Sequence, residues 1–199
     1  MKHFAYILSL LLALSCTHSP LQPGDLLFQA GEGGMPMAIE SSTGGSFSHV
    51  GILGESREDV WEAVPGDGVR HVSLRQFLDD AALDADGKPF VRVYRAPCDW
   101  EDVLERLKDL EGRPFDKAFL PGDEAVYCSE LVYECYRDSS GAPLFPAIPM
   151  TFKNASGATV SYWVNHYASL GVPIPEGEPG TNPNDLSRSP LLTPVPVKW

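Results

Sequence analysis

The sequence predicts an α+β domain in which an antiparallel sheet, open or closed into a small barrel, packs against helices. Three observations lead to this prediction. Short β-type runs separated by turns fill the first half of the chain, an amphipathic helix pattern follows them, and a second helix carrying two cysteines comes late. A chain of 199 residues with 43% apolar residues can bury one sizeable core, so a single domain is expected.

The predicted strands follow each other closely. Each is a short run of apolar, β-branched or aromatic residues bounded by turn-forming residues. The turn-prone segment GESRED separates two such runs, so these two are expected to form a β-hairpin. The expected strands are 24–31, 47–53, 60–69, the first part of 69–78, and 89–96.

The helices are expected mainly in the second half. The clearest pattern spans 99–112, where an apolar stripe repeats at helical spacing, Asp99 can cap the start and Gly112 ends the helix. In segment 69–78 the expected strand is followed by the start of a helix, and Ser73 can cap that helix. The remaining segments are less regular: 33–46 is expected to hold one helical turn, 161–171 a helix or a strand, and the proline-rich tail from Gly171 an extended or disordered path over the surface.

The N-terminus resembles an export signal. In residues 1–15 a short basic start precedes an apolar run that is too short to span a bilayer. Small residues stand ahead of Cys16, as in the signal of a lipoprotein, which is cut before the cysteine and lipidated on its thiol. Plain secretion and a buried N-terminal helix are the alternatives. With 16–23 as a tether and 24–199 as the domain, the protein is expected to be exported and anchored in the cell envelope through Cys16, facing the periplasm.

Charge and cysteine content restrict the partners and the redox chemistry. The net charge of −12, without a Lys/Arg-rich run, argues against nucleic acid as a partner. Export would place Cys98, Cys128 and Cys135 in a compartment that permits disulfides. Because three is an odd number, at least one thiol stays free or pairs outside the chain.

The segment YCSELVYECYR places two of these cysteines on one predicted helix. Cys128 falls in the first turn, where unpaired backbone N–H groups and the helix dipole stabilise a thiolate. Cys135 lies two turns deeper beside apolar residues and is expected to be a core residue. The helical rise separates the two by about 10 Å, too far for a disulfide, so Cys98 is the one disulfide partner left open for Cys128.

A base for Cys128 is expected in the hairpin. His49 lies in SFSHVGIL, on a strand face shared with small and aromatic residues. A turn centred between Glu55 and Ser56 would place Glu62 directly opposite His49, within reach of the imidazole. The alternatives are a structural hydrogen-bonding role for His49, a solvated strand carboxylate for Glu62 and a buried core position for Cys128. A thiol at a helix start, a histidine and a carboxylate are together typical of an activated-thiol site, and a metal site is not expected from their spacing.

The motifs along the chain resemble a known family. In order, GDLLF, SHVGIL, VWEAVPGDGV, GRPFDKAF, YCSELVYECY and GTNPNDLSRSPLL resemble the YiiX-like branch of the permuted NlpC-type cysteine hydrolases. The resemblance runs from about Gly24 to Leu192. It implies a circularly permuted papain-like fold, in which the histidine strand precedes the helix that carries the nucleophile at its N-terminus.

Carried over residue by residue, the resemblance assigns the nucleophile to Cys128, the histidine to His49 and the third polar residue to Glu62. Tyr127 and Asp116 match positions near the cleft and are expected to bind substrate or support the site. Phe115 stands where relatives often carry tyrosine.

The resemblance further implies a thiol-dependent hydrolase or acyltransferase that forms a thioester acyl-enzyme at an amide or ester bond, with no cofactor. Its substrate is expected to be a small peptide, a cell-wall stem peptide or a lipid or other acyl compound. An inactive envelope-binding module that holds a lipid or peptide in the same cleft is the alternative from another functional class.

Overall fold

Six antiparallel strands form one open sheet in the order β4-β3-β2-β1-β5-β8. The structure is a computed structural model and describes residues 21–120, 122 and 124–199. Within these residues β4 and β8 are the sheet edges, so the sheet is open and the small barrel considered from the sequence is not formed. The main-sheet strands are β1 (Asp25–Gln29), β2 (His49–Leu53), β3 (Asp59–Val64), β4 (Gly68–Ser73), β5 (Val91–Arg95) and β8 (Thr193–Val195), and a second small sheet pairs β6 (Ile148–Pro149) with β7 (Pro179–Gly180).

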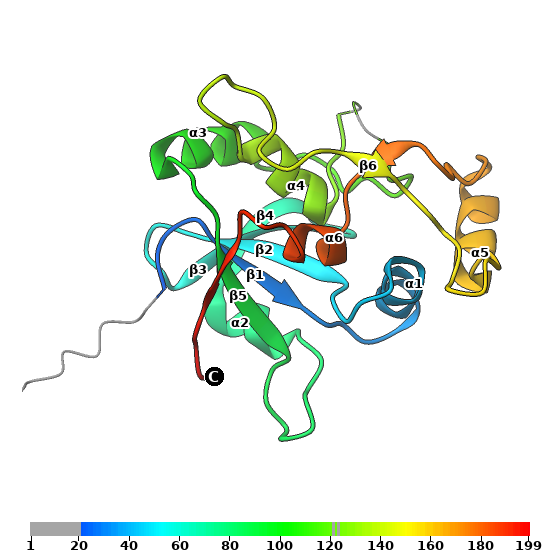
Figure 1. Cartoon of the computed structure of the whole chain (residues 1–199), viewed down its shortest axis with the longest axis horizontal. Helices are drawn as coiled ribbons and strands as arrows, with labels where there is room; N and C mark the ends of the chain where they lie inside the picture. Colours follow the sequence, from blue (N-terminus) through cyan, green and yellow to red (C-terminus); the bar gives the residue numbers. More distant parts are fainter. Residues whose placement is uncertain (1–20, 121, 123) are drawn as a thin grey trace, which may run out of the picture.

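Helices cover both faces of the sheet and one end of it (Figure 1). One core lies between the sheet and α3, α4 and α6, and a second core packs α2 on the opposite face. A third apolar cluster joins α1, α5 and the residues just before α4. The helices are α1 (Gly34–Thr43), α2 (Leu74–Asp79), α3 (Trp100–Leu110), α4 (Cys128–Cys135), α5 (Ser161–Leu170) and α6 (Pro183–Ser187).

The local signals explain most of these elements. Strand residues alternate between the two cores: Leu26 and Ile52 lie in the core beneath α4, whereas Leu27 and Leu53 lie in the core beneath α2. Two helix starts carry their predicted caps, because the Ser73 side chain accepts from the Gln76 N–H and the Asp99 side chain accepts from the Glu101 N–H. The predicted α+β architecture is therefore confirmed.

Two segments differ from expectation. α1 runs for ten residues instead of the single turn predicted, and it depends on tertiary contacts: Ala38 and Ser42 are buried, and the Trp163 indole donates to the Ser42 hydroxyl. The proline-rich tail is not a loose cover, because it contains α6 and β8, and β8 pairs with β5 at the sheet edge. Prolines are tolerated at such an edge, where one side of the strand makes no ladder hydrogen bonds.

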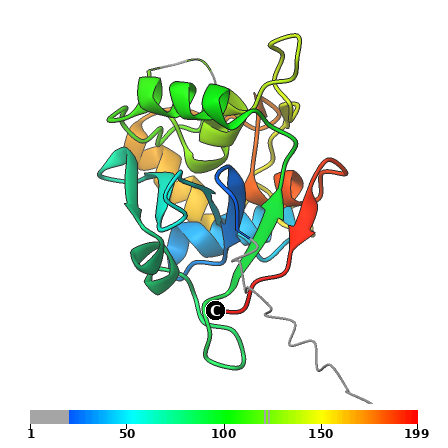
Figure 2. The ribbon, with the colours of Figure 1, turned by 90° about the vertical axis from the view of Figure 1, so that its left-hand side faces the viewer.

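The tail thus crosses back over the whole domain. Figure 2 shows β8 beside β5, with α6 above the sheet on the same side of the molecule. The C-terminal segment therefore reaches both the sheet edge and the region where α1 gives way to β2. This arrangement matters for the site, because the strand that follows α1 begins with His49.

Candidate active site

Cys128 is the first residue of α4 and is almost fully buried, with 6% of its surface exposed. The preceding residue, Tyr127, has an extended backbone, so the helix starts abruptly at the cysteine. The Tyr127 N–H donates to a Glu130 carboxylate oxygen at 3.4 Å. The N–H groups of the first helical turn lack carbonyl partners within the helix, and they give this end a partial positive charge.

His49 joins Cys128 to Glu62. The His49 side chain is 15% exposed, lines the same hollow as Cys128, and interacts with the Cys128 side chain. Its Nε2 lies 2.8 Å from Oε2 of Glu62, which is 3% exposed. Since Nε2 faces the carboxylate, Nδ1 is the nitrogen left for the thiol. The three residues expected from the sequence to form the site are thus brought together in one chain of contacts.

The register of the hairpin differs from the prediction by two residues. Ile52 pairs with Trp61 and Leu53 with Val60, so paired residue numbers sum to 113 instead of the predicted 111. Glu62 is therefore a diagonal neighbour of His49, not its direct partner. Because side chains alternate faces with a period of two, a shift of two keeps His49 and Glu62 on the same face and preserves their contact.

Arg70 is a member of this site that the sequence prediction missed. It pairs with Glu62 across β3 and β4, and its Nε and Nη2 donate to Glu62 Oε1 at 3.0 and 2.8 Å. Arg70 also contacts the carboxylate of Asp67. Each oxygen of Glu62 therefore has its own partner, which fixes the plane of the carboxylate facing His49. Extending the strand alternation across the turn at Pro65 would have placed Arg70 opposite Glu62.

These contacts set the charge states. Burial alone would lower the pKa of His49, but its hydrogen bonds and charge interactions with Cys128 and Glu62 raise the pKa to about 10. Burial would raise the pKa of Glu62, but His49 and Arg70 together lower it. The favoured arrangement at neutral pH is an imidazolium held between the Glu62 carboxylate and the Cys128 sulfur.

Cys128 lies where two hollows meet. The first, the imidazole hollow, contains His49 and Glu62, and the second, the apolar hollow, lies over the third apolar cluster. Ile39, Phe119 and Cys128 line both. The imidazole hollow is further lined by Gln29, Glu32, Met35, Asp80 and Phe115, and the apolar hollow by Met150, Phe152, Trp163, Tyr127 and Ser129.

Tyr127 and Asp116, the two residues expected near the cleft, lie close to it in different ways. Tyr127 lines the apolar hollow, and its hydroxyl accepts the Thr181 N–H at 3.0 Å. The Asp116 carboxylate accepts the N–H groups of Ala118 and Leu120, at 2.7 and 2.6 Å. Those bonds bracket Phe119, whose φ of 56° is unusual for a bulky residue. Asp116 therefore supports the aromatic wall between the hollows.

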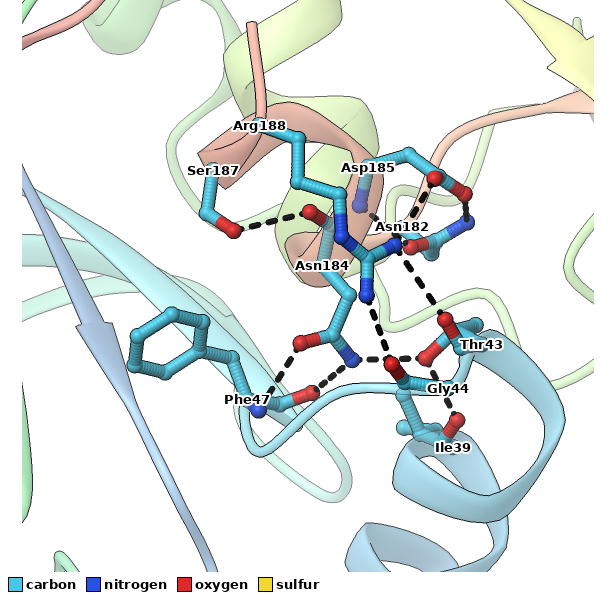
Figure 3. Close-up of polar contacts among 9 residues, drawn as sticks. All are labelled: Ile39, Thr43, Gly44, Phe47, Asn182, Asn184, Asp185, Ser187 and Arg188. Carbon is cyan, nitrogen blue, oxygen red and sulfur yellow. Dashed lines mark hydrogen bonds and ion pairs between the residues drawn. The ribbon is translucent and has the colours of Figure 1, made fainter.

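A polar cluster from the C-terminal segment holds the chain just ahead of His49 (Figure 3). Asn184 in α6 is 1% exposed, and its amide nitrogen donates to the Phe47 carbonyl and the Thr43 hydroxyl at 2.7 and 2.6 Å. The Phe47 N–H returns a bond to the amide oxygen at 3.0 Å. Arg188 donates to the Gly44 carbonyl at 2.7 Å.

The close approach of this cluster requires a glycine. A Cβ at residue 45 would lie 2.1 Å from the Asn184 amide oxygen, so any larger residue would displace the amide. The cluster therefore fixes residues 43–47, which connect α1 to the histidine strand. The motif GTNPNDLSRSPLL, which carried part of the family resemblance, supplies this clamp.

The other sequence expectations have mixed outcomes. Cys98, Cys128 and Cys135 are all free, so the disulfide alternative is not realised. Among the described residues, no group of three or more His, Cys, Asp or Glu side chains is placed to hold a metal ion. The predicted signal peptide, most of the predicted tether and Cys16 lie outside the described residues. In the part of the chain that the structure covers, no helix has the length and apolarity needed to cross a bilayer.

Comparison with known proteins agrees with the geometry. The family model for the permuted papain-like amidase enzymes, YaeF/YiiX, C92 family, matches residues 20–196. The chain is 28% identical over 204 residues to the uncharacterised protein YiiX of Escherichia coli strain K12, covering 100% of this chain and 98% of that protein.

A solved structure shares the fold. The crystal structure of "metalloprotein yiiX" from Escherichia coli O157:H7 matches with a TM-score of 0.73 and 24% identity, over 89% of this chain and 98% of that one. The relatives are YiiX proteins, so the NlpC description suggested by the sequence is a loose one. With the family model spanning nearly the whole described domain, the chain belongs to the permuted papain-like amidases of the YaeF/YiiX family.

Proposed function

We propose that this protein is a cysteine amidase that uses Cys128, His49 and Glu62 as a catalytic triad. The contact of the Cys128 thiol with His49, itself held by Glu62 at 2.8 Å, is the observation that carries the proposal. Membership of an amidase family supports the reaction class. Hydrolysis of the amide or related ester bond is the overall reaction, and an amine able to capture the acyl group would make the product by transfer instead of hydrolysis.

The reaction has two halves. In the first, the Cys128 sulfur attacks the substrate carbonyl, the His49 imidazolium gives its proton to the leaving nitrogen, the C–N bond breaks and a thioester remains. The Cys128 backbone N–H, at the start of α4, is suited to stabilise the developing oxyanion. In the second half, neutral His49 takes a proton from water, the hydroxide attacks the thioester, and the acid leaves as the thiolate and imidazolium are restored.

Glu62 and Arg70 act on this cycle through the histidine. Glu62 orients the ring and stabilises the imidazolium, and Arg70 keeps Glu62 ionised. Arg70 is therefore a positioning residue in this mechanism.

The experiment that tests the proposal is acyl-enzyme trapping. The protein would be mixed with panels of stem peptides, N-acyl amides and acyl lipids, quenched in acid and weighed by intact-protein mass spectrometry. A mass increase equal to the acyl group, mapped to the Cys128 peptide and lost in Cys128→Ala, is the expected result. Cys135→Ala is the matched control and should trap the acyl group normally. Turnover that persists in Cys128→Ala would overturn the proposal.

We also propose that the enzyme works in the cell envelope as a lipoprotein. The support is the sequence of residues 1–16, in which a short apolar run precedes Cys16. Metabolic labelling with an alkyne fatty acid should mark the wild-type chain and not Cys16→Ala. Equal absence of label from both, with the protein recovered free of membranes, would contradict the anchor and leave the enzymatic proposal untouched.

A further inference from the structure

Cys128 sits between two hollows of different chemistry, and this asymmetry has a consequence for substrate orientation. His49 and Glu62 line the imidazole hollow, whereas the lining of the apolar hollow, within the described residues, includes neither of them. A substrate carbonyl at the Cys128 sulfur has one substituent that leaves and one that stays on the enzyme. The two substituents point to opposite sides of the carbonyl carbon, so each hollow takes one of them.

The position of His49 decides which substituent goes where. The group that protonates the leaving nitrogen must come within hydrogen-bond reach of it. The leaving group therefore lies in the imidazole hollow. The acyl group that stays attached to Cys128 then extends the other way, into the apolar hollow.

Building on the triad mechanism above, we propose that the apolar hollow is the acyl subsite for a hydrophobic aminoacyl group, and that the imidazole hollow takes a neutral or cationic amine as leaving group. The substrate class is therefore a peptide-type amide with an apolar residue on the acyl side of the scissile bond. A plain fatty-acyl amide and an anionic leaving group are disfavoured.

The lining of the apolar hollow indicates a hydrophobic acyl group. Ile39, Phe119, Met150, Phe152 and Trp163 line the hollow, and the aromatic rings among them pack edge to face, with Phe119 and Phe152 each against Trp163. Such a surface favours an aliphatic or aromatic substituent over a charged one, because burying an unpaired charge there would be costly.

Ser129 distinguishes an aminoacyl group from a plain acyl chain. Ser129 is 1% exposed and lines the apolar hollow next to Cys128, and its hydroxyl has no hydrogen-bond partner. A buried hydroxyl without a partner is unfavourable unless a ligand satisfies it. An aminoacyl group has a nitrogen on the carbon next to the reacting carbonyl, whereas a fatty-acyl chain has only hydrogens there. The Ser129 hydroxyl therefore favours the aminoacyl group.

The charge of the imidazole hollow favours a neutral or cationic leaving group. The charge of Glu62 is paired with His49 and Arg70. The acidic groups left in the lining of the hollow are therefore Glu32 and Asp80, and among its described lining residues there is no Lys or Arg. Glu32 and Asp80 are exposed at its rim. Together with the net charge of −12, they disfavour an anionic leaving group and attract a cationic one, with an effect that salt weakens.

Hydrolysis of a peptide set tests the assignment. In acetyl-Phe-X-amide substrates, X is the residue on the leaving side of the scissile bond. The value of kcat/KM should be at least as high for X = Lys as for X = Ala, and about 10-fold lower for X = Glu than for X = Ala. Replacing Phe by Asp should lower kcat/KM more than 10-fold. Replacing acetyl-Phe by 3-phenylpropionyl, which lacks the nitrogen, should cost about 5- to 10-fold in the wild type, and this penalty should shrink in Ser129→Ala. A penalty that is unchanged in Ser129→Ala would overturn the role of Ser129.

A matched pair of variants separates the two hollows. Met150 lines the apolar hollow and Met35 the imidazole hollow. Met150→Ala should shift the preference for the residue on the acyl side toward larger residues such as Trp, and should leave the ranking of leaving residues X by kcat/KM unchanged. Met35→Ala should change only the range of leaving residues X that the enzyme accepts. The double substitution Glu32→Gln and Asp80→Asn should remove the discrimination between X = Lys and X = Glu. The reverse pattern for the two methionines would overturn the assignment of the hollows.

Covalent labelling keeps this test independent of turnover. Peptidyl chloromethyl ketones alkylate a thiol without hydrolysis, so acetyl-Phe and acetyl-Asp reagents report the subsite directly. Faster labelling of Cys128 by the Phe reagent without cleavage of any peptide would contradict the amidase proposal and support the acyl subsite. Cleavage of all peptides at similar rates would support the amidase and overturn the subsite.

Discussion

Cys128 and Cys135 stand at the two ends of the same helix and are both buried, yet their surroundings give them different chemistry. Cys128 contacts His49 and faces both hollows. Cys135 is 1% exposed within the apolar core that also contains Leu131 and Tyr136, and burial raises the pKa of its thiol. The neighbouring elements, and not burial or helix membership, thus decide which thiol can act as a nucleophile. Changes to either thiol or to its neighbours should therefore separate function from stability.

The largest effect should come from the thiols themselves. Cys128→Ala should lower kcat/KM at least about 10³-fold, because it removes the nucleophile. Cys135→Ala should leave kcat/KM within about twofold and lower the free energy of unfolding by about 1 kcal/mol through lost packing. Kinetics and urea denaturation check both. Equal activities of the two variants would contradict the assignment of Cys128, and not Cys135, as the nucleophile.

The next largest effect should follow from His49→Gln. We expect a loss of about 10²- to 10⁴-fold in kcat, since both proton transfers lose their carrier. The substitution should also change stability with pH. The pKa of His49 is raised from 6.5 to about 10, so its stabilising contribution is fully present below about pH 6.5 and is lost as the pH rises toward about 10.

Urea unfolding at pH 6 and pH 10 measures this dependence. The stability difference between wild type and His49→Gln should be larger at pH 6 than at pH 10. A difference that is the same at both values would show that the histidine charge does not contribute to folding.

Arg70→Gln should have an intermediate effect, because it acts only through Glu62. Without Arg70 the pKa of Glu62 should rise, so the carboxylate takes up a proton at a higher pH. The acid limb of the profile of activity against pH should therefore shift to higher pH. We expect about a 10-fold lower kcat at neutral pH. The pH profile of kcat/KM checks the mechanism, and Arg70→Lys should restore part of the acid limb. A uniform loss at every pH would mean that Arg70 is only structural.

The smallest catalytic effect is expected from the clamp in α6. Asn184→Ala removes the bonds to Phe47 and Thr43 and leaves the Phe47 backbone groups without these partners, at a cost of about 1–3 kcal/mol of stability. Activity should fall less than 10-fold at temperatures where the variant stays folded. Gly45→Ala should behave similarly by displacing the amide. Thermal unfolding checks both, and unchanged melting temperatures would exclude the clamp.

The sequence predicted the parts of this molecule that depend on local patterns. The strands and the capped helices follow from alternation and from Ser73 and Asp99. The contact of His49 with Glu62 survived an incorrect register only because the error was an even number of residues. The α1 helix was underestimated because its proline and the glycines at its two ends give weak helix signals, and a contact that holds it comes from Trp163, far along the chain.

The parts of the site that could not be predicted depend on distant contacts. Asn184 reaches Phe47 across 137 residues of sequence, and no periodic pattern encodes such a distance. The apolar hollow arises where α1, α4, α5 and the tail converge, and the imidazole hollow arises where α1 and α4 meet β2 and β3. The lining of both therefore exists only in the folded chain. Arg70 lies between these cases, since strand alternation extended by one more hairpin would have identified it.

In the proposed mechanism His49 makes Cys128 the reactive thiol, and the pH dependence of alkylation is a direct test of this role. Iodoacetamide labelling of the folded protein would be followed from pH 5 to pH 10 by peptide mass spectrometry, with Cys135 as the internal comparison. Cys128 should label at pH 6 at least about 10-fold faster than Cys135, and His49→Gln should remove this advantage. Labelling of Cys128 that is negligible at pH 6, rises about tenfold per pH unit to about pH 8.5 and is unchanged in His49→Gln would contradict this role of His49.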